Sequence, residues 1–206
     1  MPIEGATRTK KQQLEITLQR LKPLSNRSPK LEQYPTPADI AADVLWEAFG
    51  AGHIAGRSVA DLGCGNGVFA IGARLLGATA VLGVDIDCGA VGTASENAEA
   101  LGLDIDLHTA DVKDLKGSFD TVLQNPPFGA QTKHADRSFV KKALELAPVA
   151  YSLHNDGTED FVAELVQSLG GRAKPLKKYK FEIPYAFEFH RKATETVSVV
   201  LLRFER

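Results

Sequence analysis

The sequence has few of the residues that build disulfides and metal sites. Its 206 residues include two cysteines, Cys64 and Cys88, and five histidines that form no H-x-x-x-H pair. Two cysteines are too few for a disulfide framework, and neither stands in a C-x-x-C or other zinc-binding spacing. We therefore expect two small, buried, reduced cysteines and a site without metal.

Long apolar runs are also missing. No stretch resembles an 18-residue membrane span, and the first residues, with Glu4, Arg8, Lys10 and Lys11, lack the apolar segment of a secretory signal. These features predict a soluble, cytoplasmic protein without membrane contact. The length and the 44% hydrophobic content fit a single domain, residues 1–206, that buries a full core.

A large excess of one charge is absent as well. The formal net charge is −2, which argues against a protein that coats nucleic acid with its whole surface. Basic residues gather in the C-terminal third, at Arg172, Lys174, Lys177, Lys178, Lys180, Arg191 and Lys192. A local basic face would explain them, but so would lysines that protect strand edges from aggregation, and both explanations stay open.

Apolar β-branched runs alternate with segments of helical period, which predicts an α/β fold with a mostly parallel sheet and helices on both faces. The expected strands are 58–63, 80–85, 105–109, 119–124, 149–154, 172–184 and 196–204. The expected helices are 10–21, 37–49, 68–76, 88–101, 136–146 and 159–169. No helix separates the last two strands, so a hairpin should bring one antiparallel strand into a seven-stranded sheet. Residues 1–50 form a helical extension ahead of a core at 51–206.

The stretch "DLGCGNG" follows the first expected strand and opens a helix. It places Asp61 before glycines at 63, 65 and 67, and glycines let a backbone turn tightly against a ligand. The pattern is not the G-x-G-x-x-G of dinucleotide sites, and an acid at its head repels phosphate but suits a cation or amino group. Asp85 ends the second strand, where a carboxylate binds ribose hydroxyls. Together these features predict a site for a nucleoside without phosphates.

Two further strand ends point toward the same site. Asp111 follows the third strand and either reads an adenine edge or makes an Asx turn. The fourth strand ends in Asn125-Pro126-Pro127-Phe128 and should lie beside the first. A turn alone explains the amide and the prolines but not the aromatic residue.

These motifs resemble those of class I S-adenosylmethionine-dependent methyltransferases that methylate planar exocyclic nitrogens, which have a Rossmann-like fold. The flanks "LEQYPTPADIAADVLWEA", "NPPFGAQTKHADRSFVKKAL" and "FEFHRKATETVSVVLLRF" resemble the methyltransferase-like protein 5 family and its archaeal relatives. That family methylates adenine N6 in small-subunit ribosomal RNA, so the resemblance implies this activity, with S-adenosylmethionine as cofactor.

The resemblance also implies roles for particular residues. The implied cofactor-binding residues are Gln33, Tyr34, Thr36, Asp61, Gly63, Gly65, Asn66, Gly67, Asp85, Ile86, Asp111, Val112 and Asn125. Of these, Gln33, Tyr34 and Thr36 would cover the methionine end as a lid, Asp85 would hold the ribose, and Asp111 with Val112 would meet the adenine. Taken alone, Tyr34-Pro35-Thr36-Pro37 predicts a rigid linker with a helix N-cap at Thr36.

For catalysis the resemblance implies two hydrogen-bond acceptors, the Asn125 side-chain oxygen and the Pro126 carbonyl, with Pro127 keeping them rigid and Phe128 stacking on the target base. No metal or strong base is needed. The implied RNA contacts are Phe128, Lys133, His134, Arg137, Phe189, His190, Arg191 and Lys192. For His134 a solvated loop histidine, and for the 185–192 aromatics a buried hairpin, are the structural alternatives.

The family implies a partner and leaves rival functions. Its eukaryotic members work with a small zinc-binding activator along the sheet edge near the third strand, where Leu103, Ile105 and Leu107 alternate with acidic residues. An ordinary half-buried strand would show the same alternation. Protein glutamine N5-methyltransferases and guanine N2-methyltransferases of ribosomal RNA share the tetrapeptide. An RNA-binding module without activity is a third possibility, which the intact glycines and Asn125 weaken.

Overall fold

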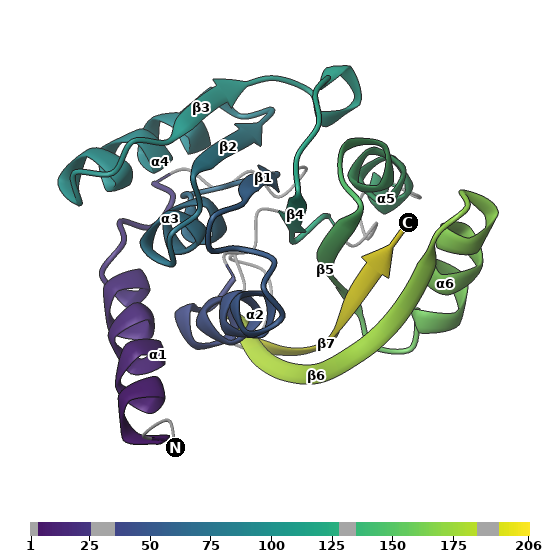
Figure 1. Cartoon of the computed structure of the whole chain (residues 1–206), viewed down its shortest axis with the longest axis horizontal. Helices are drawn as coiled ribbons and strands as arrows, with labels where there is room; N and C mark the ends of the chain where they lie inside the picture. The colour runs from purple at the N-terminus through teal and green to yellow at the C-terminus, as the bar shows by residue number, and fades with distance from the viewer. Residues whose placement is uncertain (1–3, 26–35, 128–134, 185–193) are drawn as a thin grey trace.

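The computed structural model describes residues 4–25, 36–127, 135–184 and 194–206. Within these ranges the chain forms a seven-stranded sheet in the order β3-β2-β1-β4-β5-β7-β6 (Figure 1). The strands are β1 Ser58–Leu62, β2 Ala80–Asp85, β3 Asp106–Thr109, β4 Thr121–Gln124, β5 Val149–Asn155, β6 Arg172–Pro184 and β7 Thr194–Glu205. Strand β7 runs antiparallel to β5 and β6, and the other pairings are parallel. The predicted α/β fold with one antiparallel strand is confirmed.

Helices cover both faces of the sheet. They are α1 Glu4–Gln19, α2 Ala38–Gly50, α3 Val68–Leu75, α4 Cys88–Ala100, α5 Ala135–Leu146 and α6 Glu159–Ser168, with a 3₁₀ turn η2 at Val112–Asp114. The expected ranges agree to within two residues at each end, except that α1 begins six residues before its predicted start. Rules based on local sequence are least reliable at element ends. Of the described helices, none is long and apolar enough to cross a membrane.

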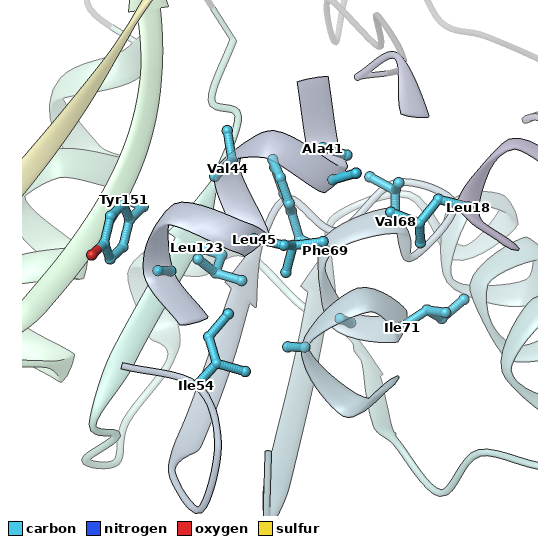
Figure 2. Packing of buried hydrophobic residues seen from close by; sticks show 14 of the residues in the cluster. Leu18, Ala41, Val44, Leu45, Ile54, Val68, Phe69, Ile71, Leu123 and Tyr151 are labelled. Carbon is cyan, nitrogen blue, oxygen red and sulfur yellow. The ribbon is translucent and has the colours of Figure 1, made fainter. Parts of the chain in front are cut away.

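The first core lies between the sheet and helices α1, α2 and α3 (Figure 2). This buried cluster contains Leu45 of α2, Phe69 of α3, Leu123 of β4 and Tyr151 of β5. Gly72 of α3 allows the close approach, because a Cβ at this position would lie 2.2 Å from a methyl carbon of Leu45. The other face carries a second core, which α5 and α6 close with Val140, Val162 and Val166.

Helix α1 docks on the first core through one apolar stripe. Leu14 and Leu18, one turn apart, are 5% and 3% exposed, and each buried leucine stabilises the docking by about 1.5–3 kcal/mol. Lys11 adds an ion pair with Asp43 of α2. The N-terminal extension is therefore packed onto the domain at α1 rather than projecting from it.

The structure contradicts one sequence expectation about surface residues and bears on another that was left open. Cys64 is buried, but Cys88 is exposed because it begins α4 at the surface. Lys177 pairs with Asp43, and Lys178 pairs with Asp156 and Glu159. For these two lysines the structure favours a neutralised strand edge over a free basic face.

Candidate functional site

Predicted site residues lie together at the carboxyl ends of three adjacent strands. Leu62, the last residue of β1, pairs with Val84 of β2 and Gln124 of β4. The residues that follow are Gly63, Asp85 and Asn125. The strand order reverses at this point, because β2 and β3 lie on one side of β1 and β4 and β5 on the other. Ligands of open α/β sheets bind at such a switch point, at the carboxyl ends of the strands.

The glycine loop adopts a backbone conformation that residues with side chains rarely adopt. Gly63, Gly65 and Gly67 have φ angles of 71°, 56° and 85°, in the left-handed region that favours glycine. The N–H groups of Gly63 and Cys64 both donate to the Val84 carbonyl, at 2.8 and 2.9 Å. These hydrogen bonds fix the loop to β2, and its glycines leave the backbone uncovered by side chains at the end of β1.

Asp61 lies beneath this loop with half of its carboxylate unused. The side chain is 1% exposed, and Oδ2 accepts a 2.9 Å hydrogen bond from the Ala70 N–H. Oδ1 is buried, and no described residue bonds it. Burial, with a further contribution from the charge of Asp85, raises the pKa of Asp61 to about 7 against the lowering effect of the Ala70 N–H. A buried unpaired carboxylate oxygen is suited to a cationic or amino group.

Asp85 ends β2 beside the loop. Oδ2 accepts from the Gly65 N–H at 2.9 Å and Oδ1 from the Asp87 N–H at 3.0 Å. Burial raises the pKa of Asp85 although these two hydrogen bonds oppose the rise. Each carboxylate oxygen retains a further lone pair. The neighbouring Ile86 is 57% exposed and offers an apolar surface against which a flat ring can pack.

Asp111 makes the turn that was one of its two alternatives. Its Oδ1 accepts a 2.9 Å hydrogen bond from the Lys113 N–H, and the 3₁₀ turn begins there. The Ala110 N–H donates to the Asp85 carbonyl at 2.9 Å, which holds the end of β3 beside that of β2. Val112 is buried. The Asx turn is confirmed, and adenine recognition by Asp111 stays a prediction.

Asn125 carries a second unused oxygen. Its Nδ2 donates to the Thr36 Oγ1 at 3.0 Å, and its Oδ1 is buried with no bonding partner among the described residues. Pro126 is buried and Pro127 half-buried. The predicted N-cap at Thr36 is wrong, because Pro37 occupies that position and no side chain caps the helix. The Thr36 hydroxyl instead fixes the Asn125 amide so that its oxygen is left free to accept.

A buried chain of hydrogen bonds lies at the end of β4 and was not predicted from the sequence. Gln124 Nε2 donates to Ser152 Oγ at 3.0 Å, and Ser152 Oγ lies 2.7 Å from His154 Nε2. Burial lowers the pKa of His154 to about 4, so the imidazole is neutral at physiological pH. The available signal was the placement of Ser152 and His154 at alternate positions of an otherwise apolar strand.

Several predicted site residues lie outside the described residues: Gln33, Tyr34, Phe128, Lys133, His134, Phe189, His190, Arg191 and Lys192. Arg137 is described, and its guanidinium carbon lies 5.0 Å from the centre of the Phe161 ring. Phe161 is 41% exposed. Both residues lie in the first turns of their helices, Arg137 in α5 and Phe161 in α6. Because these helices follow β4 and β5, this cation–π pair lies toward the carboxyl ends of the strands, where the site residues gather.

The arrangement fits a cationic nucleoside better than a phosphate ligand. Two buried acids, Asp61 and Asp85, lie beside the glycine loop, and burial together with these two charges raises the pKa of the Cys64 thiol. Two negatively charged side chains at this position repel phosphate and attract positive charge. The unpaired oxygens of Asp61 and Asn125 can each accept from an amino group.

Comparisons with known proteins agree with this chemistry. Residues 36–169 match the family described as Methyltransferase small domain. A protein of Methanocaldococcus jannaschii is 40% identical over 96% of this chain and 94% of its own length. The rRNA N(6)-adenosine-methyltransferase Mettl5 of Drosophila melanogaster is 37% identical over 96% of this chain and 97% of its own length.

A solved structure shares the fold almost throughout. The crystal structure of a candidate RNA methyltransferase from Pyrococcus horikoshii superimposes with a TM-score of 0.88 at 41% identity, over 95% of this chain and 97% of the other. Matches of this identity cover nearly the whole of each chain. The chain therefore belongs to the methyltransferase-like protein 5 family.

Proposed function

We propose that this protein transfers a methyl group from S-adenosylmethionine to N6 of an adenosine in small-subunit ribosomal RNA. The observation that carries the proposal is the buried, unpaired Oδ1 of Asn125, held beside Pro126 at the end of β4. Relatives named as rRNA N(6)-adenosine-methyltransferases, such as Mettl5 of Drosophila melanogaster, support the adenine assignment.

The site residues would compensate for the weak nucleophilicity of the target amine. The lone pair of an exocyclic amine is delocalised into the base, so the nitrogen attacks poorly. Asn125 Oδ1 and the Pro126 carbonyl accept hydrogen bonds from the two amine hydrogens, which orients the nitrogen and favours its lone pair in the direction of attack. S-adenosylmethionine supplies the electrophilic methyl group on its sulfonium. Asp61, Asp85 and Ile86 would hold its amino acid, ribose and adenine parts.

The RNA and partner assignments are part of the same proposal. The adenosine must be unpaired or flipped, because N6 is out of reach inside a duplex. Arg137 and the exposed Phe161 ring support a contact with RNA at the edge of the site. A small zinc-binding activator would pair along β3, which within the described residues has β2 as its one neighbour. Leu103 and Ile105 pack inward, so that contact would use the β3 backbone.

The experiment that tests this function is methyl transfer into small-subunit ribosomal RNA from a strain lacking the protein. Labelled S-adenosylmethionine is the donor, and nucleoside mass spectrometry identifies the product. N6-methyladenosine that is lost with Asn125→Ala supports the proposal. Label in N2-methylguanosine assigns the protein to the guanine enzymes. No label in RNA, with label in protein when a protein extract of the same strain is supplied as acceptor, assigns it to the glutamine enzymes. Label that needs an added zinc-binding subunit supports the activator.

Thr36→Val is expected to lower turnover about tenfold, because the Asn125 amide loses its hydrogen-bond acceptor and can rotate. The dissociation constant of S-adenosylmethionine, measured by calorimetry, should change less than about threefold. Thr36→Ser keeps the hydroxyl and should retain turnover. A variant with normal turnover but weakened cofactor binding would instead make Thr36 a cofactor contact.

The affinity for S-adenosylmethionine is expected to depend on pH through Asp61, whose pKa burial raises to about 7. Below this pH the carboxyl is protonated and cannot attract the cofactor's amino group, so affinity should fall by up to about tenfold per unit down to about pH 5.5. Asp61→Asn should bind weakly and show no such slope. Calorimetry across this range measures both, and a flat wild-type profile would contradict the assigned contact.

A further inference from the structure

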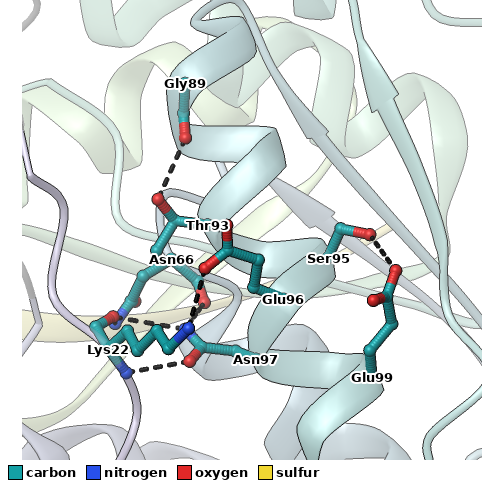
Figure 3. Close-up of polar contacts among 8 residues, drawn as sticks. All are labelled: Lys22, Asn66, Gly89, Thr93, Ser95, Glu96, Asn97 and Glu99. Carbon is teal, nitrogen blue, oxygen red and sulfur yellow. Dashed lines mark hydrogen bonds and ion pairs between the residues drawn. The ribbon is translucent and has the colours of Figure 1, made fainter.

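A buried amide on α4 joins segments that lie far apart in the sequence (Figure 3). Asn97 is 3% exposed, and the other buried residues of α4 are alanines at 90, 94 and 98. Burying an amide costs free energy unless its hydrogen-bonding groups are all paired. The inward position of Asn97 therefore requires partners from outside the helix.

Every hydrogen-bonding group of the Asn97 side chain has a backbone partner. Its oxygen accepts from the Lys22 N–H at 2.8 Å, and its nitrogen donates to the Lys22 carbonyl at 3.2 Å. The nitrogen also donates to the Asn66 carbonyl at 3.0 Å. Asn97 thus gives Lys22 the pair of bonds that a neighbouring strand would give, and a third bond fixes Asn66.

The Lys22 backbone also meets the glycine loop directly. Asn66 Nδ2 donates to the same Lys22 carbonyl at 3.1 Å, so Lys22, Asn66 and Asn97 form a closed ring of hydrogen bonds (Figure 3). The Lys22 ammonium takes no part in the ring. It makes an exposed ion pair with Glu96 at 2.9 Å, of a kind that contributes little to stability.

Asn66 stands between Gly65 and Gly67, both at positive φ, where the backbone has the most freedom to lose its shape. Asp85 restrains one side of the loop through the Gly65 N–H. Asn97 restrains the next residue through the Asn66 carbonyl. The loop is therefore held from both sides, and the second restraint is shared with the segment that contains Lys22.

Lys22 comes three residues after the end of α1. If its backbone left Asn97, a buried amide would lose two of its three hydrogen bonds, and Asn66 would lose one. Docking of this segment and the shape of the loop are thus energetically coupled, and such coupling acts in both directions.

We propose that Asn97 is a positioning residue for the methyl donor: it ties the Lys22 backbone to Asn66, so that the glycine loop keeps its binding shape while the segment after α1 is docked. The proposal rests on the proposed function, because it takes the glycine loop as the cofactor-binding loop. It makes the N-terminal extension part of the support of the cofactor site.

The test compares two changes at one exposed position. Lys22→Ala removes the ammonium and its ion pair but keeps the backbone N–H and carbonyl. Lys22→Pro removes the backbone N–H that donates to the Asn97 Oδ1. The dissociation constant of S-adenosylhomocysteine should stay within about twofold of the wild type for Lys22→Ala and rise about fivefold for Lys22→Pro.

Asn97→Ala removes all three hydrogen bonds and should raise the same dissociation constant about twentyfold. Its turnover at saturating S-adenosylmethionine should stay within about twofold of the wild type. Equal constants for the two Lys22 variants would overturn the coupling.

Hydrogen exchange of the Gly65 and Gly67 amides in the protein without ligand separates this proposal from the function on which it rests. Exchange should be about tenfold faster in Asn97→Ala and in Lys22→Pro than in the wild type and Lys22→Ala. Unchanged exchange in these two variants would overturn the restraint of the loop by Asn97, even if the enzyme methylates RNA. A wild-type protein that binds no S-adenosylmethionine would overturn the proposed function, while faster exchange in the two variants would still support the restraint by Asn97.

Discussion

Replacing Asn125 with alanine is expected to lower turnover by about 10²- to 10³-fold and to leave the dissociation constant of S-adenosylmethionine within about threefold. The Asn125 Oδ1 is buried and has no bonding partner among the described residues, so in the proposed mechanism it would accept from the target amine without rearranging. A preorganised group in a water-excluded site contributes about 2.7–4 kcal/mol to the transition state. Single-turnover methyl transfer and calorimetry measure the two quantities separately.

Two variants control this result. Asn155→Ala removes a half-buried asparagine from the end of the neighbouring strand β5 and should stay within about twofold of wild-type turnover. Asn125→Asp keeps an acceptor oxygen but loses the N–H that donates to Thr36, so it should fall between wild type and alanine. Normal turnover in Asn125→Ala would remove Asn125 from catalysis and leave the amide a structural role.

The sequence predicted the positions of those candidate site residues that lie at strand ends. Carboxyl ends of neighbouring parallel strands must meet at one edge, so Asp61, Asp85 and Asn125 could be placed together from the alternation of apolar runs. The loop glycines were predictable for a similar reason, since their spacing marks a turn that needs positive φ. The fold itself followed from the same alternation, including the antiparallel strand after a missing helix.

Partners from distant segments were not predictable in this way. A threonine before Pro37 fits the local N-cap rule, but the folded chain uses its hydroxyl for Asn125, 89 residues away. Asn97 continues an inward face of alanines, which marks it as buried, yet its partners Lys22 and Asn66 come from other segments. Cys88 was expected to be buried by residue type, but its place at the start of α4 exposes it.

Asp85→Ala is expected to weaken S-adenosylmethionine binding about 100-fold, or about 2.7 kcal/mol. The carboxylate would accept from the ribose hydroxyls, and a hydrogen bond to a charged group contributes about 1.5–3 kcal/mol. Asp85→Asn keeps the side-chain shape with one acceptor oxygen and should lose about tenfold. Calorimetry measures each constant, and a value for Asp85→Ala equal to the wild type would remove Asp85 from the ribose.

A change at Asp85 also disturbs the glycine loop, because Oδ2 accepts from the Gly65 N–H in the protein itself. A 2′,3′-dideoxy analogue of S-adenosylhomocysteine separates the two effects. If Asp85 binds the ribose, the wild type should prefer the hydroxylated ligand about 100-fold, and Asp85→Ala should show almost no preference. If the variant keeps the preference while losing overall affinity, Asp85 supports the loop and another group binds the ribose.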